Sequence, residues 1–313
     1  MKASRGKRPG RASRAAARPT GGSAFGTMHP AAARWMGALI RMTAPHPALT
    51  AILDVIGRLQ DEPFRTSFVL LGEPGTGKEG LARALHHLST STSTSTSADR
   101  PLVRLDVAGF SDDDALAALR GVGKDEGAAR RADGGTLLIE EAAGLGPRTQ
   151  MALLRLLKSG HIDLPGGPEA RGAEHDKLRV HAIAMSDHDL AGEVAAGRFR
   201  HDLYWRLARI VLTLPPLRER LDDLGPSAVW MGNRILRDAG QPFELVPTEE
   251  LPRLDPDERA RAIELPASAI SELRAHDWPG NFRELEAVLE RALLLHRAGL
   301  VLDAESIERA RRS

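Results

Sequence analysis

The sequence predicts an α/β protein built on a mainly parallel sheet, followed by a smaller helical domain. Short apolar strands alternate with amphipathic helices, a glycine-rich loop directly follows the first strand, and an apolar helical stripe dominates the C-terminal part. The chain has 313 residues, 42% of them hydrophobic, and no cysteine. We therefore expect an aliphatic core, no disulfide framework, and a reducing, cytoplasmic location. No apolar run approaches the roughly 20 residues that span a bilayer, so we expect no membrane contact.

The first 45 residues form a basic segment. The first acidic residue is Asp54, and nine Lys or Arg residues precede it. These cations are spaced by Ala, Ser, Gly and Pro, which cannot bury a core, so residues 1–45 are expected to be disordered. Three interpretations stay open: a solvated tail that includes a misplaced translation start, an Arg-rich transit-like segment, or an arm for nucleic-acid phosphates. Any DNA contact is expected through this tail alone.

An α/β domain is expected over residues 46–239. Its predicted elements are a helix from residue 47, strand 68–71, helix 78–87, strand 102–107, a helix that begins at Ser111, strand 136–139, helix 150–157, strand 180–185 and strand 210–214. Three aspartates after Ser111 are typical of a helix N-terminus. A Ser/Thr repeat at 89–97 has no periodicity and predicts a surface loop. The neighbours His86 and His87 would point about 100° apart on a helix, which argues against a shared metal.

The pattern weakens over residues 240–264, where four prolines interrupt any long element, so we interpret this segment as a linker. Residues 265–313 then predict a small helical lid domain. Its clearest signal is one apolar stripe at helical spacing, formed by Leu285, Val288, Leu289, Ala292 and Leu293.

The strand at 68–71 is followed at once by a phosphate-binding pattern. The segment reads Gly72-Glu73-Pro74-Gly75-Thr76-Gly77-Lys78-Glu79 and satisfies Gly-x4-Gly-Lys. Glycines permit close backbone approach, so N–H groups can surround a β-phosphate while Lys78 neutralises the β and γ oxygens. An ordinary glycine-rich turn is the alternative, but the strand before it and the helix after it argue for the functional interpretation. Glu79 stands where a Mg²⁺-binding Ser or Thr is usual.

A second apolar strand ends in two carboxylates. It reads Thr136-Leu137-Leu138-Ile139-Glu140-Glu141, and open α/β sheets bind ligands at this end of their strands. Glu140 is predicted to face Mg²⁺ and Glu141 to face the attacking water. A buried strand that merely ends in solvated acids is the alternative, which the upstream loop makes less attractive. ATP with Mg²⁺ is the predicted cofactor.

Five segments, taken in their order along the chain, resemble the AAA+ domain of bacterial sigma-54-dependent transcription activators. The resemblance covers about residues 46–312. The loop at 72–79 is similar to that family's GESGTGKE, which also carries Glu after Lys. The other matching segments are ADGGT at 132–136, GRFRHDLYWRL at 197–207, LPPLRER at 214–220 and WPGNFREL at 278–285.

The resemblance implies roles for three arginines. Arg200 and Arg206 would be arginine fingers that reach the γ-phosphate of a neighbouring subunit, and Arg283 would be the second sensor, which couples the nucleotide to the lid. Fingers that act on a neighbour imply a ring, a hexamer or heptamer, of this chain or with related AAA+ subunits. The alternative for each arginine is a surface or intramolecular ion pair.

Departures from the family cluster around the γ-phosphate. The family has Asp where Glu140 stands, and one methylene shifts the geometry by about 1 Å, which can cost about 100-fold in rate. The first sensor, normally Asn, is Asp187, which adds a carboxylate beside phosphate. Asp106 occupies the position of an Asn that gates the catalytic glutamate, Glu141 here. We therefore expect ATP binding with weakened hydrolysis.

The largest departure is the missing GAFTGA loop, the family's contact with the sigma factor. Only residues 122–126 separate Gly121 from Gly127. A C-terminal helix-turn-helix and a receiver-like domain ahead of residue 46 are also not expected. Two functions remain. The first is an ATPase of the activator type that regulates transcription without direct sigma-54 contact. The second is a degenerate, non-hydrolysing subunit that modulates related AAA+ proteins by mixed assembly.

Overall fold

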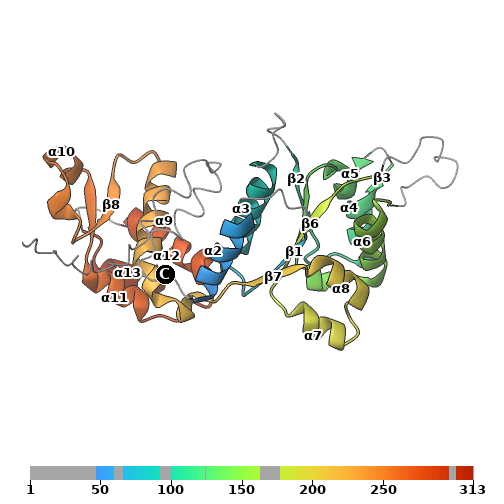
Figure 1. Ribbon diagram of the computed structural model, residues 1–313. Helices are drawn as coiled ribbons and strands as arrows, with labels where there is room; N and C mark the ends of the chain where they lie inside the picture. The colour runs from blue at the N-terminus through green and yellow to red at the C-terminus, as the bar shows by residue number, and fades with distance from the viewer. Residues whose placement is uncertain are drawn as a thin grey trace, which may run out of the picture.

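The computed structural model describes residues 47–59, 66–91, 100–123, 125–162, 177–295 and 301–312. Two segments discussed above, the basic residues 1–45 and residues 92–97 of the Ser/Thr repeat, lie outside this range. Figure 1 shows an α/β unit beside a C-terminal unit of helices and short strands. Among the described helices, none is both long and apolar enough to cross a bilayer.

Five parallel strands form the central sheet, in the order β2-β5-β6-β1-β7. They are β1 (Phe68–Leu71), β2 (Leu102–Asp106), β5 (Thr136–Glu140), β6 (His181–Ser186) and β7 (Ile210–Thr213). All five were predicted, with ends that agree to within one residue, and their parallel arrangement confirms the predicted fold class. The register sets Leu71 beside Ser186 on one side and Thr213 on the other. The carboxyl ends of these strands therefore meet at one edge.

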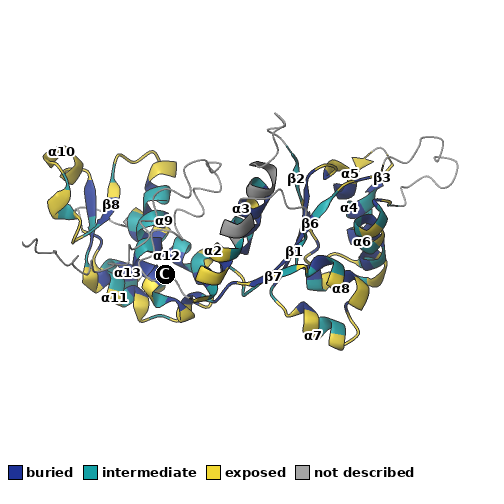
Figure 2. Cartoon of the chain, viewed as in Figure 1, coloured by how far each residue is buried: buried dark blue, intermediate teal, exposed yellow. Residues whose placement is uncertain are grey.

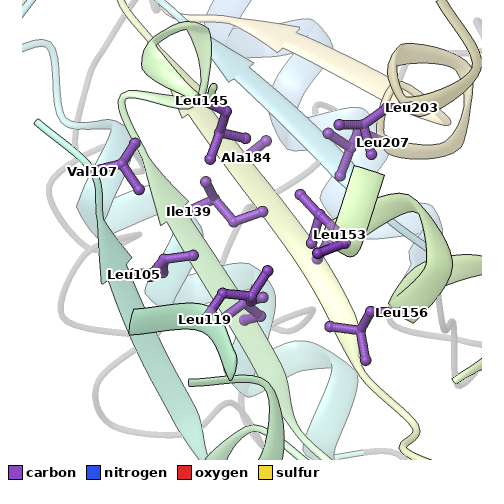
Figure 3. Packing of buried hydrophobic residues seen from close by; sticks show 14 of the residues in the cluster. Leu105, Val107, Leu119, Ile139, Leu145, Leu153, Leu156, Ala184, Leu203 and Leu207 are labelled. Atoms are coloured by element: carbon purple, nitrogen blue, oxygen red, sulfur yellow. The ribbon is translucent and has the colours of Figure 1, made fainter. Parts of the chain in front are cut away.

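Helices cover both faces of the sheet (Figure 1). On one face lie α2 (Pro47–Leu59) and α3 (Lys78–Ser91), and on the other lie α4 (Asp112–Arg120), α5 (Ala128–Arg131), α6 (Pro147–Ser159), α7 (Leu190–Ala195) and α8 (His201–Leu207). Side chains alternate accordingly, because Phe68 and Leu70 pack with α2 and α3 whereas Val69 joins the opposite core. Figure 3 shows that opposite core, where Ile139 lies close to Leu119 and Leu153.

Two local predictions concern helix ends. Ser111 is the N-cap of α4, and its side chain accepts a hydrogen bond from the Asp114 backbone N–H, as predicted. In contrast, α3 continues to Ser91, beyond the predicted end near residue 87. Buried Leu81, Ala82 and Leu85 anchor this helix, so its last turn forms despite a Ser/Thr-rich sequence.

The linker prediction for 240–264 was wrong, because these residues fold. Strands β8 (Glu244–Pro247) and β9 (Ala262–Leu265) pair in parallel, and between them lie a 3-10 turn (Leu251–Arg253) and α10 (Pro256–Arg259). Prolines do not break these elements because they stand at positions that tolerate them. Pro256 is the first residue of α10, after an Asp255 capping box, and such a position needs no N–H donor.

The C-terminal unit also begins earlier than the predicted boundary at 239. Helix α9 (Leu224–Asp238) packs Leu224, Ala228 and Met231 into the same core as α11 (Ala267–Arg274), α12 (Asn281–Leu295) and α13 (Ala304–Arg312). The predicted stripe on α12 is confirmed, since Leu285, Val288, Leu289 and Ala292 are buried and Leu293 packs against them. Figure 2 shows these inner faces in dark blue and α10 mostly exposed.

Burial of His86 predicts a pH-dependent stability. Its Nδ1 lies 2.8 Å from Thr136 Oγ1, and burial, followed by the charge of His87, lowers the pKa of His86 from 6.5 to about 4. Between these pH values the unfolded state binds more protons, so the free energy of unfolding should fall by about 2 kcal/mol as the pH drops from 6.5 to 4.

His86→Asn should make the free energy of unfolding, measured in urea between pH 4 and 6.5, depend less on pH. The matched change at exposed His188, His188→Gln, should leave the slope in place. A slope that survives His86→Asn unchanged would contradict the assignment.

Candidate functional site

A cavity of about 530 Å³ lies where the carboxyl ends of the central strands face the C-terminal unit. One end is polar and is lined by the loop at 74–80 with Glu140, Glu141 and Asp187. The other end carries apolar side chains from α2, α9 and α12, such as Leu49, Met231 and Phe282. The cavity therefore offers both charged groups and apolar surface, at the sheet edge where ligands are expected.

The predicted phosphate-binding loop packs directly against the C-terminal unit. Gly75 has φ +77°, and a Cβ there would lie 2.3 Å from the Gly280 carbonyl oxygen, so only glycine fits this approach. Phe282 N–H also donates to the Gly75 carbonyl at 3.0 Å. Helix α3 begins at Lys78, so the free N–H groups of its first turn point toward the polar end of the cavity.

Lys78 is held by three oxygens. Its Nζ donates to the Gly72 carbonyl at 2.5 Å, to the Glu73 carbonyl at 3.0 Å and to Asp187 Oδ1 at 2.5 Å. The side chain of Lys78 is 9% exposed. The lysine predicted to neutralise phosphate is therefore already paired with the residue that replaces the family's first-sensor Asn.

Glu141 follows β5 in a left-handed conformation, φ 54° and ψ 47°. This conformation costs a non-glycine residue about 1 kcal/mol and is enriched at functional sites. Burial first, and the negative charge of Asp187 second, raise the pKa of Glu141, and the two carboxyl groups hydrogen-bond. Asp187 thus contacts both the candidate base and the phosphate-binding lysine.

Glu140, the predicted Mg²⁺ ligand, is bound by an arginine of the neighbouring strand. Arg104 Nε lies 2.6 Å from Glu140 Oε1, and Arg104 Nη2 lies 3.0 Å from Oε2. Glu79 accepts from Arg83 and lies 3.4 Å from Arg104 Nη1. Across the described residues, no group of three or more acidic or imidazole side chains is arranged to hold a metal ion. The donor set therefore fits Mg²⁺ poorly as it stands.

Asp106 does not take the gating contact that its position predicts. Its Oδ1 accepts from the Ala108 backbone N–H at 3.0 Å and so closes the turn after β2. The register pairs Asp106 with Glu140, whereas Glu141 interacts with Asp187.

Asn281 connects the loop to the C-terminal unit. It is fully buried, with φ 52°, and its Oδ1 accepts from Leu217 N–H at 2.7 Å. Its Nδ2 donates to the Pro74 carbonyl at 3.0 Å and to Glu73 Oε2 at 3.2 Å. Arg218 also binds Glu73 through both of its terminal nitrogens, and hydrogen bonds from Arg218 and then Asn281 lower the pKa of Glu73 to about 2.

Three cationic side chains of the C-terminal half line the cavity, those of Arg220, Arg234 and Arg283. Arg283 of α12 lines it, as expected for a second sensor. Arg220 lines it too, 4% exposed, and its Nη2 donates to the Thr76 carbonyl at 3.0 Å. Its guanidinium lies 4.6 Å from the centre of the Phe282 ring, and burial lowers its pKa to about 10.

The predicted arginine fingers lie elsewhere. Arg200 forms a two-pronged pair with Asp202 at 3.0 and 2.9 Å, and Arg206 donates Nε and Nη2 to the Leu157 carbonyl at 3.0 and 2.6 Å. Arg206 lines a separate pocket of about 450 Å³. Neither arginine lines the cavity beside Lys78.

Gln150 links the acidic turn to the finger segment. Its Nε2 donates to the carbonyls of Leu145 and Arg198 at 2.7 and 3.0 Å, and its Oε1 accepts from Arg200 N–H at 2.8 Å. The side chain is buried with its amide fully used.

The segment that follows Gly121, where we expected no GAFTGA loop, is a short hairpin. Strands β3 (Gly121–Val122) and β4 (Asp125–Glu126) pair antiparallel. A Cβ on Gly121, which has φ +90°, would lie 2.2 Å from the Asp125 carbonyl oxygen. The two strands therefore approach each other closely at Gly121.

Sequence reasoning missed five residues of this region. Arg218, Arg220 and Asn281 lie inside segments that we matched to the family. The match showed that these segments belong to the family pattern, but it did not show which residues the three side chains contact. Arg104 stands two residues before Asp106, and strand alternation places both on the face that Glu140 shares. Gln150 carried no signal that periodicity could reveal.

The comparisons with known families agree with this geometry. A family model described as the sigma-54 interaction domain matches residues 42–213, and one described as the AAA+ ATPase lid domain matches residues 251–313. Because the second match starts after β8, it covers only part of the C-terminal unit described above.

Similar curated proteins include transcriptional regulators of bacteria. The chain is 33% identical over 264 residues to the Nif-specific regulatory protein of Azotobacter vinelandii, covering 82% of this chain and 44% of that protein. It is 34% identical over 264 residues to transcriptional regulatory protein ZraR of Klebsiella oxytoca, covering 81% and 52%. The chain thus spans about half the length of these relatives.

Among solved structures, NtrX from Brucella abortus in complex with ADP has a TM-score of 0.67 and 27% identity, covering 87% of this chain and 55% of that one. The ATP complex of the same protein has a TM-score of 0.66 and 26% identity, covering 85% and 56%. The resemblance extends over both units of the chain described here.

The contacts of Asn281 predict a large loss of stability in Asn281→Asp. The variant keeps the acceptor for Leu217 N–H, loses both donated bonds and places a carboxylate about as close to Glu73 as the amide is now. We expect the free energy of unfolding in urea to fall by about 3 kcal/mol, with partial recovery when Glu73→Gln removes the facing charge.

Asn233 provides the control, because its side chain also binds backbone groups, those of Leu245 at 2.6 and 3.0 Å, but within one unit. Asn233→Asp should cost about 1 kcal/mol. Equal losses for the two variants would contradict the special role of Asn281.

Proposed function

The chain belongs to the family of sigma-54 interaction domains, AAA+ ATPases of transcription regulators, and from this premise we propose that it binds ATP in the 530 Å³ cavity and hydrolyses it slowly. The observation that carries the proposal is the loop at 72–79, with Lys78 at the N-terminus of α3 and Glu141 on the same cavity wall. The phosphates would lie at the polar end, and the base among Leu49, Met231 and Phe282. The protein would act in the bacterial cytoplasm, on transcription.

Three features of the polar end support slow hydrolysis. Asp187 withdraws Lys78 from the phosphates, because the two side chains already form an ion pair at 2.5 Å. Asp187 also places a second carboxylate beside Glu141, which adds negative charge where the γ-phosphate is expected. Glu140, finally, is engaged by Arg104.

The positions of Arg200 and Arg206 support the proposal that the chain assembles into a ring. Both lie outside the cavity of their own subunit, so as fingers they act on the nucleotide of a neighbour. Exposed Trp205 lies between them on α8, with 58% of its surface accessible, and would be covered in such an assembly.

Direct contact with sigma-54 is not part of this proposal. The hairpin of β3 and β4 has two residues in each strand, and a fully extended segment from Gly121 to Gly127 spans about 20 Å, which leaves at most about 10 Å of projection. Its tip lacks the aromatic-threonine pair of the family loop. The protein would therefore regulate transcription through other subunits or another target.

A second candidate is a nucleotide-binding subunit without hydrolysis that joins related AAA+ proteins in mixed rings. The double engagement of Asp187, with Lys78 and with Glu141, favours it. The two candidates share the binding step and differ in turnover.

Lys78→Ala tests the binding step. We expect ATP affinity in calorimetry to fall by about 100-fold, since the variant removes the charged donor at the phosphates. Lys158→Ala, at an exposed position of α6, should bind as the unmodified chain does. Equal affinities for the unmodified chain and Lys78→Ala would refute the assignment of the site.

Asp187→Asn tests the cause of slow turnover. The neutral amide releases Lys78 and removes the negative charge beside Glu141, so we expect kcat to rise about tenfold, an effect of roughly 1.4 kcal/mol. Asp238→Asn makes the same charge change at an exposed position and should leave kcat unchanged.

Turnover in both variants is measured per subunit across protein concentration, where an increase supports fingers that act on a neighbour. A folded Asp187→Asn with unchanged kcat would show that Asp187 is not the cause. Undetectable turnover in every variant would favour the second candidate.

A further inference from the structure

We propose that Arg104 takes the place of the divalent cation beside Glu140, so that this chain binds ATP with nearly the same affinity with and without Mg²⁺. The inference rests on the proposed function, because it concerns the same cavity. It concerns a property that the family pattern alone does not predict, since that pattern assigns the acidic residue at this position to the metal.

The contact is two-pronged and uses the whole carboxylate. Nε and Nη2 of Arg104 each bind a different oxygen of Glu140, at 2.6 and 3.0 Å. The side chain of Glu140 is only 17% exposed. A planar guanidinium matches a carboxylate in this arrangement, which is the strongest form of hydrogen-bonded ion pair.

The fold places Arg104 there by register. Strands β2 and β5 are neighbours, and Asp106 lies opposite Glu140, so Arg104 stands one pleat earlier on the same face. From this position the long arginine side chain reaches forward to Glu140. Because the contact comes from a neighbouring strand of the same sheet, it does not depend on the concentration of any ion.

Two further acidic groups near Glu140 are also occupied. Glu79, at the place of the usual Ser or Thr ligand, accepts from Arg83 at 2.8 and 3.2 Å and lies 3.4 Å from Arg104 Nη1. Asp187 is paired with Lys78. Glu140, Glu79 and Asp187 therefore each have a cationic partner from this chain, and only Glu141 among the acidic residues that line the cavity beside the loop is paired with another carboxyl group instead.

Mg²⁺ is poorly suited to displace these partners. It requires near-ideal octahedral geometry and gives up water reluctantly, so at such sites it relies on one or two free carboxylates besides the phosphates. Arginine keeps its charge at any ordinary pH and never vacates the position by deprotonation. The phosphates can instead be neutralised by Arg283 and by the N-terminus of α3.

The test is the ratio of the Kd for ATP in excess EDTA to the Kd in saturating Mg²⁺, measured by calorimetry. We expect a ratio of no more than about three for the unmodified chain. Arg104→Met frees Glu140 for a metal, and we expect its ratio to rise to about ten or more, mainly through weaker binding in EDTA, where the freed carboxylate repels the phosphates.

Arg83→Met is the matched control, because Arg83 contacts Glu79 but not Glu140. It should keep the ratio of the unmodified chain. Arg104→Lys, which keeps the charge without the planar fork, should give an intermediate ratio and serves as the second variant if Arg104→Met does not fold.

The outcomes separate the inference from the proposed function. A tenfold loss of ATP affinity in EDTA for the unmodified chain, or an unchanged ratio in folded Arg104→Met, overturns the inference and leaves ATP binding standing. Absence of ATP binding by the unmodified chain in both conditions overturns the proposed function and the inference together. A ratio that rises equally in Arg83→Met would assign the effect to Glu79 and so refute the role of Arg104.

Discussion

The amide of Asn281 joins three segments that are distant in the sequence. It binds the Leu217 backbone, the Pro74 carbonyl and the Glu73 carboxylate, and it is fully buried while doing so. The left-handed backbone at Asn281 allows the next residue, Phe282, to donate to Gly75. The cavity exists because these contacts hold the loop at 72–79 against the C-terminal unit. Arg283 and Arg220 reach that cavity only as a consequence of the same junction.

Around the cavity, internal pairing governs the chemistry. Lys78 pairs with Asp187, Asp187 with Glu141, and Glu140 with Arg104. The pairs of opposite charge, Lys78 with Asp187 and Arg104 with Glu140, satisfy partly buried charges that would otherwise be costly. The same pairs compete with a nucleotide for its most important contacts. The departures from the family pattern therefore act together, since they form one set of contacts rather than isolated changes.

The parts of the molecule that the sequence predicted depend on local patterns. Strand alternation, the loop at 72–79 and the stripe on α12 are all readable within one short window. The predictions that were wrong or missing depend on longer stretches of sequence or on contacts between distant residues. Residues 240–264 looked like a linker because prolines were taken as breaks, although Pro256 stands where a helix accepts it. The pairing of Arg104 with Glu140 spans 36 positions and follows only once β2 and β5 are known to be neighbours.

The left-handed backbone of Glu141 has an evolutionary consequence. A glycine or asparagine at this position would relieve the strain, so selection for thermal stability alone favours losing the carboxylate. Only selection for what the side chain does can oppose that drift. A lineage in which this glutamate persists despite the strain is therefore one in which its chemistry still matters, whatever the other substitutions around it have done to the rate.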